Sequence, residues 1–238
     1  MTPIIYLDKC KSTNDDIENL ISVEPRAIIS LYTFHQTKGR GQYGNSWETS
    51  KNLNLAFTIA LSEDCIKVRN NLFNFHTANM MAEFFANMTK IPIEIKWPND
   101  LIIANKKVAG ILIEKKKIGG IYYYIVGIGI NVLQENFLNL PNAGSLWTQT
   151  HQKFDLHELA NQLHEHLGVQ LVQDIPAEKV WKNVQSRLFR KNVISVFEIQ
   201  SIRQNGIIKS IDEEGLLCVD LEDDGLKKFR FKEINLLY

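Results

Sequence analysis

The sequence predicts an α+β protein with one large mixed domain and one small β domain. Strand-like and helix-like segments are mixed as far as residue 188, and short strands joined by glycine turns follow Arg190. A chain of 238 residues is long enough for one large domain, or for one large and one small domain. We place the boundary near Phe189, which gives domains at residues 1–188 and 189–238.

Strands and helices both occur in the segments before residue 90. Ile4–Leu7 is a short apolar strand, and a helix begins near Ser12, because Ser, Thr and Asn cap helices and Asp15 and Asp16 follow. The next two apolar, β-branched runs predict buried strands at Ala27–Phe34 and Leu53–Leu61. The polar, glycine-containing segment between them, residues 35–52, is expected to be a long loop, here called the glycine–arginine loop. Apolar residues at helical spacing then predict a buried helix over Asn70–Met88.

Strands predominate from residue 91 to residue 132. Ile91–Lys96 alternates apolar and other residues, and a hairpin is expected where Asn105, Lys106 and Lys107 separate two apolar runs. The runs of this region are Leu101–Ala104, Val108–Glu114 and Ile118–Val132.

The rest of the chain predicts helices and then a small β domain. The helices are expected at Asp155–Val172 and Ala177–Leu188. Four short strands follow, at Asn192–Ile199, Ser201–Ile211, Gly215–Leu221 and Leu226–Phe231. The expected turns are Asn205-Gly206, Glu214-Gly215 and Asp224-Gly225, and this spacing suggests a small β-barrel.

Composition excludes several classes of protein. Lys+Arg and Asp+Glu both number 27, so net charge gives no argument for binding nucleic acid or a membrane surface. The 3 cysteines are far apart and form no zinc-ligand spacing, and they fit a reducing compartment. The N-terminus lacks the features of a signal peptide, and no run approaches the ~20 apolar residues of a membrane span. A cytoplasmic protein is expected.

The glycine–arginine loop contains the letters of a dinucleotide-binding motif, from Gly39 to Gly44. A Rossmann motif needs a helix directly after the glycines, but residues 45–52 are polar and aperiodic. Closely spaced glycines can instead offer backbone N–H groups to an anion, and Arg40 adds a planar cation suited to phosphate. On the letters alone, a loop of this kind is more often a solvated turn than a phosphate site.

Two further motifs could carry chemistry. In Lys96-Trp97-Pro98-Asn99-Asp100, Asp100 stands where a strand begins, and Lys107 at the following hairpin could face the same cleft. A structural Asp and a surface Lys would explain the same letters. Glycines within a strand, at Gly127 and Gly129, indicate a close approach to the backbone, by a ligand or by another strand.

Taken together and in order, these motifs resemble the catalytic region of biotin–protein ligases. The matching elements are Ser12-Thr13-Asn14, the segment from Gly39 to Trp47, Lys96 to Asp100 with Lys107 and Gly110-Ile111-Leu112, and Gly127 to Asn131. The match covers roughly Tyr6 to Val132, and the remainder agrees only in layout. The resemblance implies a mixed sheet with helices on one face, of the kind also found in class II aminoacyl-tRNA synthetases, and a small C-terminal SH3-like barrel.

The resemblance also implies an activity. Such an enzyme joins biotin and ATP, with Mg²⁺ carried by the ATP and no fixed protein metal site, into biotinyl-5′-AMP. It then transfers biotin to a lysine of a biotin carboxyl carrier protein. Biotin contacts would come from Ser12, Thr13, Asn14, Gln36, Gly39, Arg40, Lys107, Gly110 and Gly127. ATP or adenylate contacts would come from Arg40, Gly41, Gln42, Trp47, Lys96, Asn99, Lys107 and Asn131.

By resemblance, three residues take part directly in the reaction. Arg40 would hold the reacting carboxylate and phosphate, and Lys107 would contact the biotin carboxylate and the α-phosphate. Asp100 would help the acceptor lysine to lose its proton or would orient the amine.

The sequence departs from the family pattern in two places. Many relatives have a second Arg where this chain has Gln42, and a basic residue where it has Asn45, so we expect weaker retention of the adenylate. Ser12 lies near residue 1, which leaves no room for the DNA-binding domain of some relatives, and no nucleic-acid or membrane partner is expected. A lipoate–protein ligase and a non-catalytic nucleic-acid-binding module remain alternatives, and both a monomer and a homodimer remain open.

Overall fold

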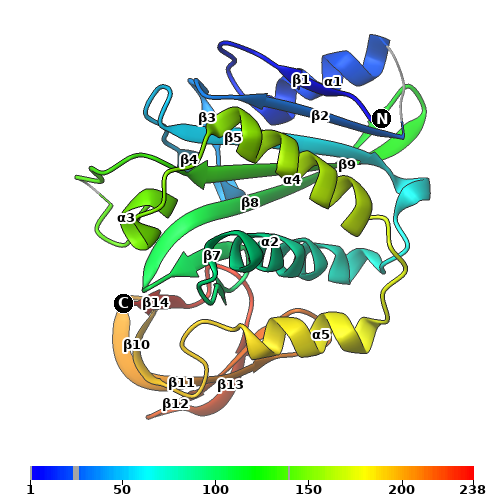
Figure 1. Ribbon diagram of the computed structural model, residues 1–238. Helices are drawn as coiled ribbons and strands as arrows, with labels where there is room; N and C mark the ends of the chain where they lie inside the picture. Colours follow the sequence, from blue (N-terminus) through cyan, green and yellow to red (C-terminus); the bar gives the residue numbers. More distant parts are fainter. Residues whose placement is uncertain (1, 24–26, 139) are drawn as a thin grey trace.

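A computed structural model describes residues 2–23, 27–138 and 140–238, so Met1, the first residue of the expected catalytic domain, lies outside the described residues. Its centre is a seven-stranded sheet with the order β1-β2-β5-β9-β8-β7-β6 (Figure 1). β1 and β2 are parallel and the other neighbours are antiparallel, so the expected mixed sheet is confirmed. The strands are β1 (Ile4–Tyr6), β2 (Ile28–Thr33), β5 (Asn54–Ser62), β6 (Glu94–Lys96), β7 (Asp100–Ile103), β8 (Lys106–Ile118) and β9 (Ile121–Asn131).

Helices cover both faces of this sheet, which corrects the expectation of helices on one face. Figure 1 shows α2 (Phe73–Thr89) and α4 (Leu156–Gln170) across one face, with α5 (Ala177–Ser186) beside α2. α1 (Thr13–Val23) lies on the opposite face, where its Ile17 and Ile21 form a separate apolar cluster. The physical reason is that central strands are apolar on both faces; all nine residues of β5 are buried.

α1 covers only part of its face of the sheet. Beyond its N-terminus, the same face carries small residues on the three central strands, namely Ala56, Thr58, Gly110, Gly127 and Gly129. Because small side chains leave space above a sheet, this half of the face can hold a ligand.

A β-bulge in β8 determines which residues of this strand face that space. Leu101 pairs with Ala109 and Ile102 with Lys107, so Val108 is an extra residue in β8. Residues 107 and 110 would lie on opposite faces of a regular strand. The bulge puts Lys107 and Gly110 on the same face, while Val108 and Ala109 are buried in the core beneath α2 and α4.

The C-terminal strands form a separate five-stranded antiparallel sheet with the order β13-β12-β11-β10-β14. Its strands are β10 (Ile194–Ile199), β11 (Ile202–Ile211), β12 (Leu217–Leu221), β13 (Gly225–Phe229) and β14 (Asn235–Leu237). The turn expected at Asn205-Gly206 is wrong, because both residues lie inside β11. The chain turns instead at Gln200 and Ser201, which have positive φ angles of 49° and 66°.

The two sheets are joined by specific contacts as well as by the chain. The indole Nε1 of Trp97 donates a hydrogen bond of 2.9 Å to the Gly215 carbonyl, and its ring lies 6.0 Å from that of Phe231. Trp97 precedes Pro98 through a cis peptide bond. The motif Lys96 to Asp100 therefore meets the C-terminal sheet directly.

Candidate functional site

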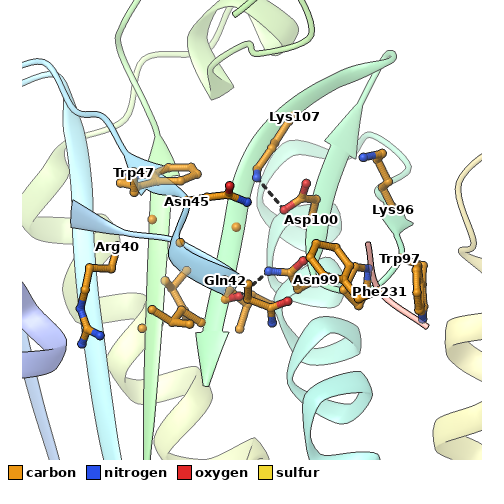
Figure 2. A pocket seen from close by; sticks show the side chains of 18 of the residues that line it. Arg40, Gln42, Asn45, Trp47, Lys96, Trp97, Asn99, Asp100, Lys107 and Phe231 are labelled. Atoms are coloured by element: carbon orange, nitrogen blue, oxygen red, sulfur yellow. Dashed lines mark hydrogen bonds and ion pairs between the residues drawn. The ribbon is translucent and has the colours of Figure 1, made fainter. Parts of the chain in front are cut away.

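A cavity of about 580 Å³ lies over the half-face of small residues, between the seven-stranded sheet and the C-terminal sheet (Figure 2). All four sequence motifs contribute to its lining. The expected site residues that line it are Ser12, Thr13, Asn14, Gln36, Arg40, Gly41, Gln42, Trp47, Lys96, Asn99, Asp100, Lys107, Gly110 and Gly127. Arg40 and Lys107 both line this cavity.

One side of the cavity is a polar wall made of Ser12, Thr13, Asn14 and Gln36. The Gln36 Oε1 accepts hydrogen bonds from the Thr13 backbone N–H at 2.9 Å and from its hydroxyl at 3.2 Å. The first turn of α1 therefore meets the start of the glycine–arginine loop here. Ser12, Thr13 and Asn14 are buried although they are polar, and all three line the cavity.

Gly127 allows the polar wall to reach the sheet. A Cβ on Gly127 would collide with the side-chain amide of Asn14. The close approach predicted from a glycine within a strand is therefore made by a side chain of the same protein.

Trp47 forms the second side of the cavity and comes from β4 (Ser46–Trp47), which pairs with β3 (Gly39–Arg40). Its indole lies against Gly129 and Gly110, and a Cβ on Gly129 would collide with the ring. Among the described residues, the buried indole Nε1 of Trp47 has no hydrogen-bond partner. A ligand with an acceptor atom at this position would satisfy it.

Lys107, Asp100 and Lys96 form the charged part of the site. Lys107 Nζ lies 2.7 Å from Asp100 Oδ1 and 5.4 Å from the centre of the Trp47 ring (Figure 2). Burial lowers the pKa of Lys96, Asp100 raises it, and Lys107 lowers it further. Burial, with a smaller contribution from Asp100, raises the pKa of Tyr238 to about 12, and Lys96 Nζ lies 5.3 Å from the centre of this ring. Two ammonium groups and one carboxylate therefore leave a net positive charge, suited to an anion.

A second cavity of about 690 Å³ adjoins the first and shares Trp47, Lys96, Asp100 and Lys107 with it. Asn131 lines this second cavity and donates a hydrogen bond of 2.9 Å to the Gly144 carbonyl. Gly144 lies just before α3 (Leu146–Thr150), a short helix that the sequence analysis did not identify. The shared residues stand where the two cavities meet.

Three expected site residues have roles in the fold of the site. Gly39 does not line either cavity; a Cβ there would collide with the Trp47 backbone and the Gln36 side chain. The Gly41 N–H donates to the Asn45 carbonyl at 2.7 Å, inside the loop. The side chain of Asn99 donates a 2.6 Å hydrogen bond to the Ile111 carbonyl, and this bond joins β8 to the turn before β7.

Arg40 lines the cavity, but its guanidinium points away from Lys107 (Figure 2). Its Nη2 atom lies 2.6 Å from Asp15 Oδ1 and 3.0 Å from Glu114 Oε2, and its Nη1 atom lies 3.1 Å from Glu114 Oε1. A role at a phosphate would require Arg40 to leave both carboxylates.

The sequence analysis missed several residues around the site. Thr58 and Glu114 bond to the polar wall, and each carries a weak signal, a polar residue within or at the end of an apolar strand. The C-terminal sheet supplies Phe197, Asn235 and Leu236 to the first cavity, and the segment between β13 and β14 supplies Phe231. No local sequence signal identifies these residues, because only the docking of the two sheets brings them to the site.

Within the described residues, no helix is long and apolar enough to cross a membrane, and no group of three His, Cys, Asp or Glu side chains could hold a metal ion.

Comparisons with known proteins agree on one family. The biotin–[acetyl-CoA-carboxylase] ligase of Mycobacterium tuberculosis is 24% identical over 206 residues, which are 81% of this chain and 73% of the relative. The bifunctional ligase/repressor BirA of Escherichia coli is 28% identical over 209 residues, 82% of this chain and 61% of the relative. The structure of the biotin protein ligase of Aquifex aeolicus in complex with biotin and ATP superposes with a TM-score of 0.81 at 24% identity, covering 100% and 99% of the two chains. Residues 9–131 match the model of the biotin/lipoate A/B protein ligase family, and the chain belongs to this family.

Proposed function

We propose that the protein is an ATP-dependent biotin–protein ligase, which forms biotinyl-5′-AMP and transfers biotin to a lysine of a biotin carboxyl carrier protein. The observation that carries the proposal is the junction of two cavities at Lys107, Asp100 and Trp47. An adenylating enzyme must bring a carboxylate and a triphosphate to one point, and this junction offers positive charge between two separate compartments.

The first cavity is proposed to hold biotin. Its polar wall can exchange hydrogen bonds with the ureido group, and the apolar surfaces of Trp47, Ile128 and Leu112 can cover the rest of the molecule. The biotin carboxylate would then point toward Lys107. The similar structure of the Aquifex aeolicus enzyme is a complex with biotin and ATP. This supports biotin rather than lipoate as the carboxylic acid that the protein activates.

The second cavity is proposed to hold the nucleotide. Asn131 and other residues that line this cavity would surround the base, namely Gln134, Asn136, Phe137, Leu138, Leu140, Pro141, Asn142 and Ala143, with the α-phosphate at Lys107 and Lys96. Mg²⁺ is usually held by one or two carboxylates together with substrate phosphates, and Glu48 and Asp100 line this cavity. This donor set fits an ion that arrives with ATP and supplies further positive charge to the phosphates.

The reaction proceeds in two steps. A biotin carboxylate oxygen attacks the α-phosphorus, and pyrophosphate leaves. The acceptor lysine amine then attacks the acyl carbon, AMP leaves, and the amine gives up a proton. Asp100 is proposed to receive this proton or to orient the amine. Its side chain is 15% exposed, and its carboxylate already forms an ion pair with the ammonium group of Lys107.

The direct test is incubation with biotin, MgATP and a biotin-carrier domain, with mass spectrometry of the carrier. One added biotinyl group per carrier, absent when its acceptor lysine is changed to arginine, is expected. Lipoate in place of biotin is the matched control. Modification by lipoate and not by biotin would contradict the proposal, as would failure to modify the carrier with either acid.

The smaller sheet and the remaining expectations belong to the same proposal. We propose that residues 189–238 form an SH3-like barrel that packs beside a catalytic domain at residues 1–188. The enzyme is proposed to act in the cytoplasm and to have no nucleic-acid partner, in keeping with its net charge of zero.

A further inference from the structure

A continuous chain of hydrogen bonds runs behind the polar wall and returns to the glycine–arginine loop. It begins at Arg40, whose two terminal nitrogens donate to the two oxygens of Glu114 at 3.0 and 3.1 Å. The Glu114 Oε2 also accepts a 2.8 Å hydrogen bond from the side-chain amide of Asn14. One carboxylate therefore joins the loop to the polar wall.

The chain continues through buried hydroxyl groups. Thr58 has one hydroxyl hydrogen to share between Asn14 Oδ1 at 2.7 Å and Thr13 Oγ1 at 2.8 Å. The Thr13 hydroxyl then donates to Gln36 Oε1 at 3.2 Å, near the start of the loop, and the Thr49 hydroxyl near its end donates to the Gln36 carbonyl at 3.1 Å. This series of hydrogen bonds therefore begins and ends in the glycine–arginine loop.

The residues joined by this series of hydrogen bonds differ in solvent exposure. Thr13, Asn14 and Thr58 are buried, with relative exposures of 4%, 3% and 0%. The side chains of Glu114 and Arg40 are 21% and 42% exposed. Glu114 thus links the partly exposed Arg40 of the loop to the buried Asn14, and it lies outside the residues that line the cavity.

We propose that Glu114 is a positioning residue, which couples the biotin-binding arrangement of Thr13 and Asn14 to the ordered state of the glycine–arginine loop through Arg40. This inference rests on the proposed function and deepens it. In this arrangement Arg40 acts through Glu114 and holds the loop, and the positive charge for the phosphate comes from Lys107 and Lys96. Asp15, 2.6 Å from Arg40, is a second carboxylate that holds the same guanidinium.

Hydrogen–deuterium exchange of the ligand-free protein tests this coupling without any substrate. Glu114→Gln keeps the shape of the side chain and an acceptor for Asn14 but loses the charge that binds Arg40. We expect amides of residues 36–52 to exchange about three- to tenfold faster in this variant. Arg40→Gln should give a similar increase, and the double variant should add little to either. Glu63→Gln, which removes the ion pair of Glu63 with the neighbouring β8 residue Lys115, is the matched control.

Steady-state kinetics supply the second readout. Glu114→Gln and Arg40→Gln should each raise the KM for biotin about three- to tenfold and leave the KM for ATP unchanged. Loop exchange equal to that of wild type in Glu114→Gln, additive effects in the double variant, or a raised KM for ATP in Arg40→Gln would each overturn the inference. Wild-type protein that gives no heat of binding with biotin would contradict the proposed function alone, since the exchange result needs no ligand.

Discussion

At the scale of single residues, the site depends on charges held in place before any substrate arrives. Lys107 faces both cavities and is fixed by Asp100 and by the Trp47 ring. A cation that is already oriented stabilises the negative charge on the phosphoryl oxygens without a cost of reorganisation during the reaction. The neighbouring Lys106 has the same chemistry but reaches the Pro141 carbonyl at 2.5 Å.

These two lysines provide a matched pair of variants. Lys107→Met should lower the rate of biotin-dependent exchange between pyrophosphate and ATP by about 10²- to 10³-fold, because it removes this cation. Lys106→Met should change the rate less than about threefold. Equal losses in the two variants would show that position on β8, and not the direction of the side chain, decides the effect.

Gln42 and Asn45 replace basic residues of the family pattern, and both line the first cavity. Gln42 stands in place of the second Arg of the loop. It lines the first cavity within the loop and carries no charge. A cation here would form a charge-assisted hydrogen bond with the phosphate of biotinyl-5′-AMP. We therefore expect Gln42→Arg to slow release of the adenylate from the enzyme by about tenfold, measured by rapid filtration of labelled intermediate. Unchanged release would mean that Gln42 does not approach the phosphate.

At the scale of secondary structure, the sequence predicts most elements and few of their orientations. Apolar periodicity locates α2 and α4 because their buried faces are long. It does not assign α1 to a face of the sheet, since the central strands are apolar on both sides. The bulge at Val108 is also invisible in the sequence, although it decides where Lys107 points. Both outcomes depend on packing between distant segments.

The helical layer contains the buried histidines His76 and His164 and the partly buried His166. Burial lowers the pKa of each, while a backbone carbonyl partner raises it by less. For His164, Nε2 lies 3.1 Å from the Thr2 carbonyl, which can only accept, so Nε2 carries the hydrogen of the neutral ring. Its Nδ1 is then the acceptor for the Ser30 hydroxyl at 2.8 Å, and a second proton on Nδ1 would make this hydroxyl the acceptor instead.

These histidines should make the protein less stable in mild acid. The folded-state pKa is below the ordinary value of 6.5, so the unfolded chain binds more protons as the pH falls through that value. Full stability is expected above pH 6.5 and a decline below it. The urea midpoint should be lower at about pH 5.5 than at about pH 7.5, and His164→Gln should reduce this difference. Parallel curves for the variant and the wild type would exclude a contribution from His164.

At the scale of the whole molecule, the site is complete only where the two sheets meet. Trp97, which lies between β6 and β7, lines the first cavity, and its indole N–H donates to the Gly215 carbonyl in the turn between β11 and β12. The side chain of Asn71 adds a 3.3 Å hydrogen bond to the Glu213 carbonyl, and Gln185 bonds to the backbone of Ile211. The C-terminal residues Asn235 and Leu236 then line both cavities. Docking of the smaller sheet is therefore part of building the site.

Trp97→Phe tests this dependence by removing one hydrogen-bond donor and keeping an aromatic ring. The Gly215 carbonyl loses its partner, so we expect the free energy of unfolding to fall by about 1–3 kcal/mol. Trp147→Phe is the control, because the Trp147 indole N–H donates at 3.1 Å to the exposed Glu135 and does not join the two sheets. This substitution should lower the free energy of unfolding by less than about 1 kcal/mol. Trp97→Phe should also raise the KM for both substrates. The lost bond would hold the C-terminal sheet less firmly, and Asn235 and Leu236 of this sheet line both cavities. Equal losses of stability in the two variants, with unchanged KM values, would mean that the smaller sheet docks independently of the site.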